Sequence, residues 1–346
     1  MIKIAVIGTG KMGLSHLSIL GAHPDVFIVG IADTSKLIND VFHKFSTVQI
    51  FHDYRKMLDM TMPDAVVVSL PNQMHELVVE ELLHRKIHVF VEKPFCMNTE
   101  KGNYLVDLVN RYQLINQVGY HNKFIGTFEE AKKIISNNYL GKINHFVGEA
   151  YGPVVIKKGL HSWRSNEKDG GGCLMDYASH VIDLLNDLVS PIQKVHGSIL
   201  KKIFSNDVED AVYSLLETKE RTTGILSVNW SDDTYRKMST TITINGTDGK
   251  LIADATELKV YFKNHNTPLG YSKGWNVKSI IDFVRPINFY LRGEEYSLQL
   301  DYFIKSIQGL VPNIINTFES ALQTDLVISQ IKKYQKQNNE QNLIWG

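Results

Sequence analysis

The sequence predicts an α/β protein with two domains, a doubly wound parallel sheet followed by an α+β domain with a mainly antiparallel sheet. Three observations lead to this prediction. Short apolar runs alternate with amphipathic segments over roughly the first 120 residues, as in parallel βαβ units. The first apolar run ends in a glycine-rich turn. Runs rich in β-branched residues dominate positions 195–262.

In the first half, we expect strands at residues 3–7, 26–32, 65–70, 88–91 and 115–118, and helices at 12–20, 54–59, 74–86 and 101–112. The run at 65–68 is apolar on both faces, which is typical of a strand covered by helices on both sides. The pattern changes after Tyr120, so the sequence is divided into a dinucleotide-binding domain at 1–122 and a second domain at 123–346.

In the second half, Thr127 and Glu130 form a capping-box pattern that predicts a helix to about residue 137. A strand at 143–151, a polar glycine-rich stretch at 152–172 and a helix at 173–188 follow. Residues 245–249 read as a hairpin turn, and further helices are expected at 297–308 and 317–334. The aromatic and basic segment 264–295 is either packed on its own sheet or another subunit, or is a flap over the substrate.

The composition excludes several functional classes. The chain has 346 residues, with 37 Lys and Arg against 37 Asp and Glu, and so no formal net charge. A balanced charge without basic runs gives no reason to expect nucleic acid or a membrane as a partner. Cys96 and Cys173 form no CxxC pair, so we expect neither a disulfide framework nor a zinc site. With no run of ~18 apolar residues and no leader before the first strand, a cytoplasmic protein is expected.

The glycine turn predicts dinucleotide binding. Residues 8–13 read Gly8, Thr9, Gly10, Lys11, Met12 and Gly13, and Asp33 follows Gly13 by 20 positions at the end of the next apolar run. The three glycines permit a tight turn, close approach of a diphosphate and close helix packing. Asp33 would then bind the ribose hydroxyls and favour NAD over NADP, a preference that Lys36 would soften; the alternative is that Asp33 only caps a helix.

Two later strand ends carry further candidates. Ser69, Pro71 and Asn72 follow the apolar run at 65–68 and would form a loop over the cofactor. His75, in the first turn of the next helix, is a further cofactor-binding candidate, and a structural role is the alternative. Glu92 and Lys93 follow the run at 88–91, at the carboxyl edge where parallel sheets bind ligands. The Lys93 ammonium would bind and polarise a substrate oxygen; the alternative is a structural ion pair.

The helix expected at 173–188 carries Asp176 and His180 four positions apart, on one face. A carboxylate beside an imidazole suits proton transfer, because histidine titrates near neutral pH. An exposed pair without a role and a pair of metal ligands remain alternatives, although no third ligand is evident. We therefore expect no metal.

With these residues, the chain resembles the Gfo/Idh/MocA family, named for glucose-fructose oxidoreductase, inositol dehydrogenase and a rhizopine catabolism protein. The resemblance covers nearly the whole chain. It rests on the glycine turn, the Glu92-Lys93-Pro94 triplet, Gly119-Tyr120, Trp163-Arg164 and the pair Asp176 and His180.

The resemblance implies a Rossmann domain followed by a domain whose open, mainly antiparallel sheet forms a homodimer or homotetramer interface. It implies that Lys93, Asp176 and His180 are catalytic, with His180 as the base for a sugar hydroxyl. Substrate would also contact Tyr120, Asn122, Trp163 and Arg164. His121-Asn122-Lys123 departs from the Asn-Arg-Arg that the family often shows, which puts a contact carried over to Lys123 in doubt.

The substrate expected is a sugar that carries a nucleotide or a phosphate. Lys157, Lys158, Trp163 and Arg164 would meet a diphosphate and a base or sugar face; a solvated basic loop is the alternative. Similar chains include oxidases of the sugar 3-hydroxyl in surface-polysaccharide or amino-sugar biosynthesis. An inositol or free-sugar dehydrogenase, or a sensor of the same fold without turnover, remains an alternative.

Overall fold

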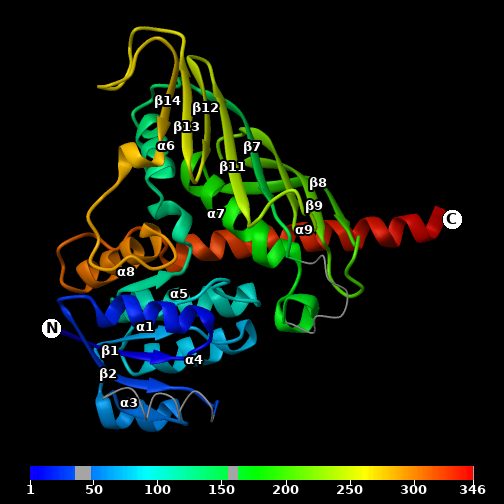
Figure 1. The fold of residues 1–346 in the computed structure, drawn as a ribbon. Coiled ribbons are helices and arrows are strands. Elements are labelled where there is room, and N and C mark those ends of the chain that lie inside the picture. The colour runs from blue at the N-terminus through cyan, green and yellow to red at the C-terminus, as the bar shows by residue number, and fades with distance from the viewer. Residues whose placement is uncertain (36–47, 155–162, 346) are drawn as a thin grey trace. The chain divides into compact units, whose positions relative to one another are not determined.

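The computed structural model describes residues 1–35, 48–154 and 163–345, and its chain folds into two units (Figure 1). The N-terminal unit consists of Met1–Phe124 and Arg285–Leu322, and the C-terminal unit of Ile125–Val284 and Gln323–Gly346. The predicted division at residue 122 placed all later residues together, whereas residues 285–322 return to the N-terminal unit. The contacts that bring this segment back join residues far apart in the sequence, which local patterns do not report.

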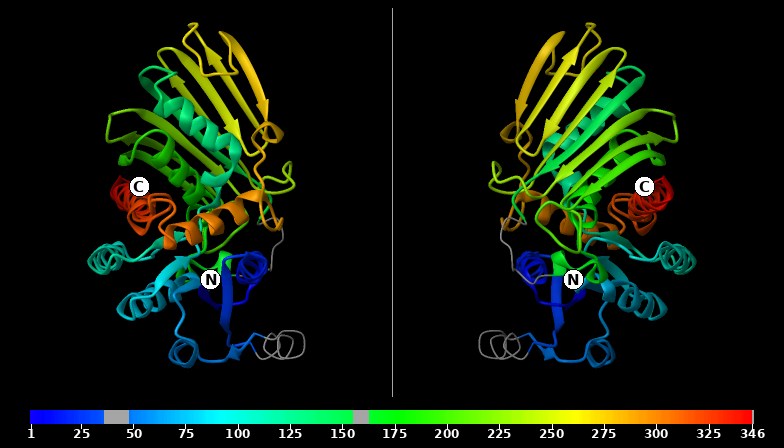
Figure 2. Two further views of the ribbon diagram at one scale, coloured as in Figure 1. Left: turned by 90° about the vertical axis from the view of Figure 1, so that its left-hand side faces the viewer. Right: turned by 90° about the vertical axis from the view of Figure 1, so that its right-hand side faces the viewer.

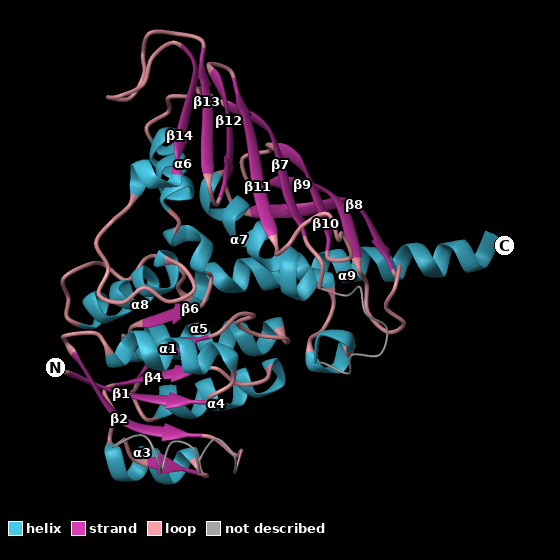
Figure 3. Ribbon diagram, in the orientation of Figure 1, coloured by secondary structure: helices cyan, strands magenta, loops and turns pink. Residues whose placement is uncertain are grey.

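The N-terminal unit contains a parallel sheet in the order β3-β2-β1-β4-β5-β6 (Figure 3). Its strands are β1 (Ile2–Ile7), β2 (Val26–Ala32), β3 (Ile50–Phe51), β4 (Ala65–Val68), β5 (His88–Val91) and β6 (Asn116–Val118). The strand order reverses between β1 and β4, and ligands of such sheets bind outside the carboxyl ends of the strands at this point. The structure therefore confirms the predicted doubly wound parallel sheet.

Helices cover both faces of this sheet. They are α1 (Lys11–Gly21), α3 (Tyr54–Thr61), α4 (Asn72–His84), α5 (Thr99–Tyr112) and α8 (Glu294–Ile307). Helices α1 and α8 bury Leu20 and Phe303 against Ile4 and Phe90 of the sheet. Helices α4 and α5 lie on the opposite face from α1 (Figure 2). Helix α8, which comes late in the sequence, thus completes the core of this unit.

The C-terminal unit contains a sheet in the order β14-β13-β12-β11-β7-β10-β9-β8. Its strands are β7 (Ile143–Tyr151), β8 (Ile192–Lys201), β9 (Ala211–Thr218), β10 (Thr223–Asn229), β11 (Ser239–Gly246), β12 (Gly249–Asp254), β13 (Glu257–Phe262) and β14 (Gly274–Ser279). Strands β7 and β10 are parallel, and the other neighbouring pairs are antiparallel. The sheet is therefore mainly antiparallel, as predicted. Strand β14 pairs with β13, so part of segment 264–295 belongs to this sheet.

Helices lie on one face of the C-terminal sheet (Figure 2). They are α6 (Gly126–Ser136), α7 (Ser179–Leu188) and α9 (Phe318–Trp345), of which the last begins in the N-terminal unit. Alternate residues of the strands point toward these helices and are buried in the core, among them Phe146, Leu216 and Leu226. The residues between them point to the other face, where Leu215 and Ile225 are exposed. Of the described helices, none is long and apolar enough to span a membrane.

One local expectation is wrong, and the structure adds a detail to another. Thr127 does not cap α6, which begins at Gly126; its buried hydroxyl donates instead to the carbonyl of Asp254. The helix expected at 173–188 is present, and its first part, Leu174–Ala178, is a π-helical segment that precedes α7. Such wide turns often occur at functional sites. At Thr127 a tertiary contact overrides the local sequence pattern.

The Asp210 carboxylate holds the β8–β9 connection together. It accepts hydrogen bonds from the backbone N–H groups of Ile203, Phe204 and Ser205 and from the indole N–H of Trp230. Burial alone would raise the pKa of Asp210, but these hydrogen bonds outweigh it and the pKa lies below the ordinary value.

We predict that Asp210→Ala destabilises the protein by about 1–3 kcal/mol, because it leaves the buried indole N–H of Trp230 and three backbone N–H groups without their acceptor. A carboxyl group whose pKa is lowered by folding stabilises the protein above its unfolded pKa, and this stability is lost as the pH falls through the folded pKa. The difference between wild type and variant should therefore shrink at acidic pH. Urea denaturation followed by tryptophan fluorescence measures it, with exposed Asp207→Ala as the control; equal effects of the two variants would contradict this role.

Candidate active site

The glycine turn shows which of its three glycines the chain itself requires. Gly8 has φ +88°, and a Cβ there would lie 2.3 Å from the carbonyl oxygen of Ser69. A Cβ on Gly13 would lie 1.9 Å from the carbonyl oxygen of Gly8. A Cβ on Gly10, in contrast, would meet nothing within 4 Å among the described residues. Packing therefore demands Gly8 and Gly13, whereas the open space at Gly10 fits the close approach of a diphosphate.

Helix α1 begins directly after Gly10, and no side chain of a described residue caps it. Exposed Lys11 and half-buried Met12 open the helix, and its first turn carries no acidic residue. The first N–H groups of a helix lack intrahelical partners and favour an anion. These features fit the diphosphate of a dinucleotide such as NAD.

Asp33 is tied to the glycine turn. One carboxylate oxygen accepts hydrogen bonds from the backbone N–H of Thr9 at 2.7 Å and from its hydroxyl at 2.6 Å. The other oxygen accepts from the N–H of Ser35 at 2.7 Å. Burial would raise the pKa of Asp33, but these hydrogen bonds lower it below its ordinary value, so the group is an anion at neutral pH. Lys36 lies outside the described residues.

The loop after β4 leads into helix α4. The Ser69 N–H donates to the carbonyl of Ile7, Pro71 is exposed, and Asn72 is buried at the start of the helix. His75 is also buried, and its two ring nitrogens lie 2.8 Å from the carbonyl oxygen of Pro94 and 2.9 Å from that of Leu70. Burial lowers the pKa of His75. The structure thus places its ring between two loops of the carboxyl edge.

Lys93 is the second residue after β5, and a cis peptide bond joins it to Pro94. Its neighbour Glu92 accepts a hydrogen bond from His16 Nε2 of helix α1 at 2.5 Å, and its side chain is only 12% exposed. Burial would raise the pKa of Glu92, but His16, Lys93 and His121 lower it below its usual value. A carboxylate therefore lies next to the lysine in the chain.

The end of β6 lines the same edge of the sheet. A Cβ on Gly119 would lie 3.0 Å from the carboxylate of Glu92, so glycine makes room for that group. Tyr120 is fully buried, and His121 stacks on Tyr296 with ring centroids 4.5 Å apart. Burial lowers the pKa of His121 to about 4, so this ring is neutral.

Asn122 is buried within a 3₁₀ turn, His121–Phe124, that also contains Lys123. Its side-chain nitrogen has no hydrogen-bond partner among the described residues. A buried donor without a partner is costly unless a ligand or water accepts from it. This is the kind of donor that the hydroxyl groups of a bound ligand satisfy.

In the C-terminal unit, the π-helical segment presents Asp176, and α7 presents His180 in its first turn. Both side chains are buried. An Asp176 carboxylate oxygen accepts from Arg164 Nε at 2.8 Å. The Arg164 side chain is 41% exposed, so the sequence candidates Arg164 and Asp176 form one partly accessible ion pair.

Glu209 binds the start of the π-helical segment, and the sequence analysis did not identify this residue. Its carboxylate accepts from the N–H of Leu174 at 2.9 Å, and its carbonyl from the N–H of Cys173 at 3.0 Å. Gly172 has φ +107°, and a Cβ there would lie 2.3 Å from the Glu209 carboxylate. Burial raises the pKa of Glu209 above its usual value.

The glycine triplet connects Arg164 with this helix start. The Gly172 N–H donates to the carbonyl of Arg164 at 3.0 Å, and a Cβ on Gly171 would lie 2.3 Å from the same oxygen. The backbone of Trp163 begins a 3₁₀ turn, Trp163–Ser165. Lys157 and Lys158 lie outside the described residues.

Lys93 belongs to the N-terminal unit, and Asp176 and His180 belong to the C-terminal unit. The described residues contain no cluster that could hold a metal ion. The sequence analysis missed His16, although its position three residues after Gly13 on the buried face of a helix was a usable signal.

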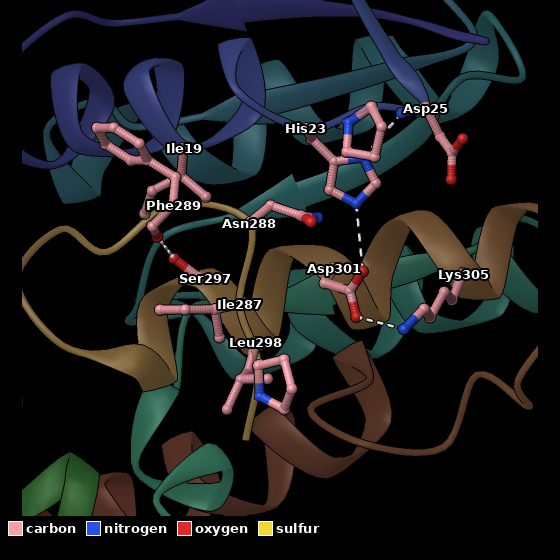
Figure 4. A pocket seen from close by; sticks show the side chains of 12 residues that line it. Ile19, His23, Asp25, Ile287, Asn288, Phe289, Ser297, Leu298, Asp301 and Lys305 are labelled. Carbon is pink, nitrogen blue, oxygen red and sulfur yellow. Dashed lines mark hydrogen bonds and ion pairs between the residues drawn. The ribbon is translucent and has the colours of Figure 1, made fainter. Parts of the chain in front are cut away.

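A cavity of about 280 Å³ in the N-terminal unit lies away from these residues (Figure 4). It is lined by the α1–β2 connection, by residues 286–289 and by α8, whose Asp301 bonds to His23 and Lys305. It lies beside the amino end of β2, opposite the carboxyl edge, and none of the candidate site residues lines it.

We predict that Gly10→Val folds normally but binds NADH at least about tenfold more weakly, because its side chain fills the space that the diphosphate needs. Gly13→Val is the matched variant, and its clash with the Gly8 carbonyl should lower the melting temperature. Fluorescence titration with NADH and thermal unfolding separate the two effects. Unchanged NADH affinity in Gly10→Val would show that the diphosphate binds elsewhere.

Two family models match the chain. The oxidoreductase family with an NAD-binding Rossmann fold matches residues 2–120, and the GFO/IDH/MocA C-terminal domain matches residues 128–252. Glucose-6-phosphate 3-dehydrogenase of Bacillus subtilis is 25% identical over 187 residues, which are 54% of this chain and 53% of the relative. The chain spans about half the length of the first curated relatives that it matches.

Solved structures share the whole fold. Levoglucosan dehydrogenase in complex with NADH and levoglucosan superposes with a TM-score of 0.85 at 21% identity, over 97% of each chain. The WlbA dehydrogenase from Bordetella pertussis, in complex with NADH and UDP-GlcNAcA, superposes with a TM-score of 0.79 at 21% identity, over 97% of each chain. Since the two family models together match more than two thirds of the sequence, the protein belongs to the Gfo/Idh/MocA family of oxidoreductases with an NAD-binding Rossmann fold.

Proposed function

We propose that the protein is an NAD-dependent dehydrogenase that oxidises a hydroxyl group, at C3, of a phosphorylated or nucleotide-linked sugar to a ketone. The observation that carries this proposal is the carboxyl edge of the parallel sheet. There the open space at Gly10, the anionic Asp33 and the lysine next to Glu92 follow three strands of one sheet. Such an edge can hold a dinucleotide and present an ammonium group to an alcohol.

NAD bound at the glycine turn supplies the acceptor for the hydride that leaves the sugar carbon. The residues of the chain then act on the hydroxyl group. Lys93 binds its oxygen and stabilises the negative charge that develops there. His180 accepts the hydroxyl proton, for which an imidazole is suited near neutral pH. Asp176, which Arg164 pairs with, binds substrate and assists the proton transfer.

Asp33 supports a preference for NAD over NADP. It is ionised and bonded on both oxygens to the turn around it, so it is fixed in place. An anion at this position accepts hydrogen bonds from ribose hydroxyls and repels a 2′-phosphate.

The choice of a charged sugar rests on Arg164 and on the relatives. Arg164 is partly exposed beside Asp176, and a guanidinium recognises phosphate well. The names of the relatives include a dehydrogenase of glucose 6-phosphate and a complex with UDP-GlcNAcA. Oxidation at C3 would prepare such a sugar for amination, which fits surface-polysaccharide or amino-sugar biosynthesis.

We further propose that the protein forms a homodimer or homotetramer through the uncovered face of the C-terminal sheet. Leu215 and Ile225 are cross-strand partners on this face, and Ile199 pairs with Tyr213 on the same side. All four side chains are at least 40% exposed. Exposed apolar side chains clustered on a sheet face are typical of protein–protein interfaces.

We predict that the purified protein reduces NAD with a sugar phosphate or a nucleotide sugar. A screen of UDP-, dTDP- and GDP-sugars, hexose phosphates and inositols, with NADH absorbance as the readout, tests the substrate class.

On the substrate found, Lys93→Ala and His180→Ala should each lower kcat by roughly 10²–10⁴-fold, the usual contribution of an acid–base group, with NADH affinity nearly unchanged. Near-normal rates in both variants would refute the mechanism, and turnover of inositols alone would refute the charged substrate.

We predict that Leu215→Glu with Ile225→Glu yields monomers, because two buried carboxylates per subunit would disrupt an apolar interface. Light scattering after size-exclusion chromatography measures the mass of the assembly. The exposed pair Lys219→Glu and Glu220→Lys serves as the control. An oligomer of unchanged mass in the Glu variant would place the interface elsewhere.

A further inference from the structure

The chain neighbours of Lys93 are both bonded to buried histidines, which come from two different helices. His16 of α1 bonds to the Glu92 carboxylate on one side, and His75 of α4 bonds to the Pro94 carbonyl on the other. His16 is 0% and His75 is 1% exposed. Residues 92–94, which we call the lysine segment, are therefore held from both sides by rings that solvent does not reach.

Each histidine also belongs to an element that would contact the dinucleotide. Helix α1 carries His16 and begins at the glycine turn. The second ring nitrogen of His75 lies 2.9 Å from the carbonyl oxygen of Leu70, next to the exposed Pro71 of the loop after β4. One histidine thus lies between the lysine segment and the helix that begins at the glycine turn, and the other lies between the lysine segment and the loop after β4.

Resting on the proposed function, we propose that His16 and His75 are positioning residues that set the place of Lys93 relative to the bound dinucleotide. Neither ring needs to touch substrate. A displacement of about 1 Å of a group that acts on the reacting atoms costs up to roughly 10²-fold in rate. Two buried bonds on the flanking residues oppose such a displacement.

His16 has a second effect, because it bonds to a carboxylate. Glu92 also faces Lys93, His121 after β6, and Tyr296 of α8, and its charge acts on buried His75. The hydrogen bond from His16 favours the ionised form of Glu92. Without it the carboxyl group takes up a proton at a higher pH, and the anion beside Lys93 is lost there.

The test compares His16→Leu and His75→Leu with the conservative variants His16→Gln and His75→Gln. His84→Leu, an exposed histidine on α4, is the control. Both leucine variants should lower kcat by about 10- to 100-fold, while NADH affinity and KM stay within about threefold of wild type. The two glutamine variants should retain part of the rate that the leucine variants lose. Only His16→Leu should move the acidic limb of the kcat–pH profile to higher pH. Wild-type kcat and an unmoved acidic limb in folded variants would overturn the proposal.

A readout without turnover separates this inference from the proposed function. Amide hydrogen exchange of residues 92–97, with NADH bound, should be about tenfold faster in each leucine variant and unchanged in His84→Leu. If the wild-type protein oxidises none of the sugars, the proposed function fails, and the exchange rates still decide the positioning role. Unaltered exchange in both leucine variants would then overturn it.

Discussion

The close approach of β1 and β4 at their carboxyl ends is the constraint on which the N-terminal site depends. The chain turns at Gly8 so near to Ser69 that no Cβ fits between them. This contact lies where the strand order reverses, so the two connections leave toward opposite faces of the sheet. Sheets of this type bind dinucleotides at this point. The loops after β5 and β6, which carry Lys93 and Asn122, follow strands of the same sheet edge.

The second constraint is electrostatic, because the edge contains a largely buried carboxylate. A buried charge is costly unless it is paired and hydrogen-bonded. Glu92 meets this requirement through His16 and Lys93, and Gly119 leaves space for it. His121, which is near the same groups, stays neutral because burial and Lys93 lower its pKa. The charge of Glu92 is thus compensated where the carboxylate is buried.

The sequence was sufficient for those parts of the fold that follow from local patterns. The period of the apolar runs predicted the parallel strands, and the hairpin at 245–249 is formed by β11 and β12 around residues 247 and 248. The glycine turn and the family motifs predicted an NAD-binding domain, which the family model confirms. Each strand pattern, the hairpin and each single motif lies within a short stretch of consecutive residues.

What the sequence did not predict depends on residues that meet only in the folded chain. His16 and Glu92 are 76 positions apart, and Glu209 lies 35 positions from the N–H group that it caps. Thr127 matched a capping box, yet its hydroxyl bonds to a carbonyl 127 positions away. The Arg164–Asp176 bond is closer in sequence, but it depends on a glycine triplet that folds the backbone of residue 172 against that of residue 164.

Each of the two units contains a buried carboxylate, and different side chains compensate its charge. In the N-terminal unit a nearly buried carboxylate, Glu92, is compensated by His16 and the lysine beside it. In the C-terminal unit Asp176 is compensated by Arg164, and the π-helical segment that carries it is fixed by Glu209 at its first N–H groups. In each case the charge is neutralised within its own unit before any substrate arrives. Charges that are paired in this way are fixed in place, and fixed groups stabilise a developing oxyanion, which the proposed function requires, more effectively than groups that must reorganise.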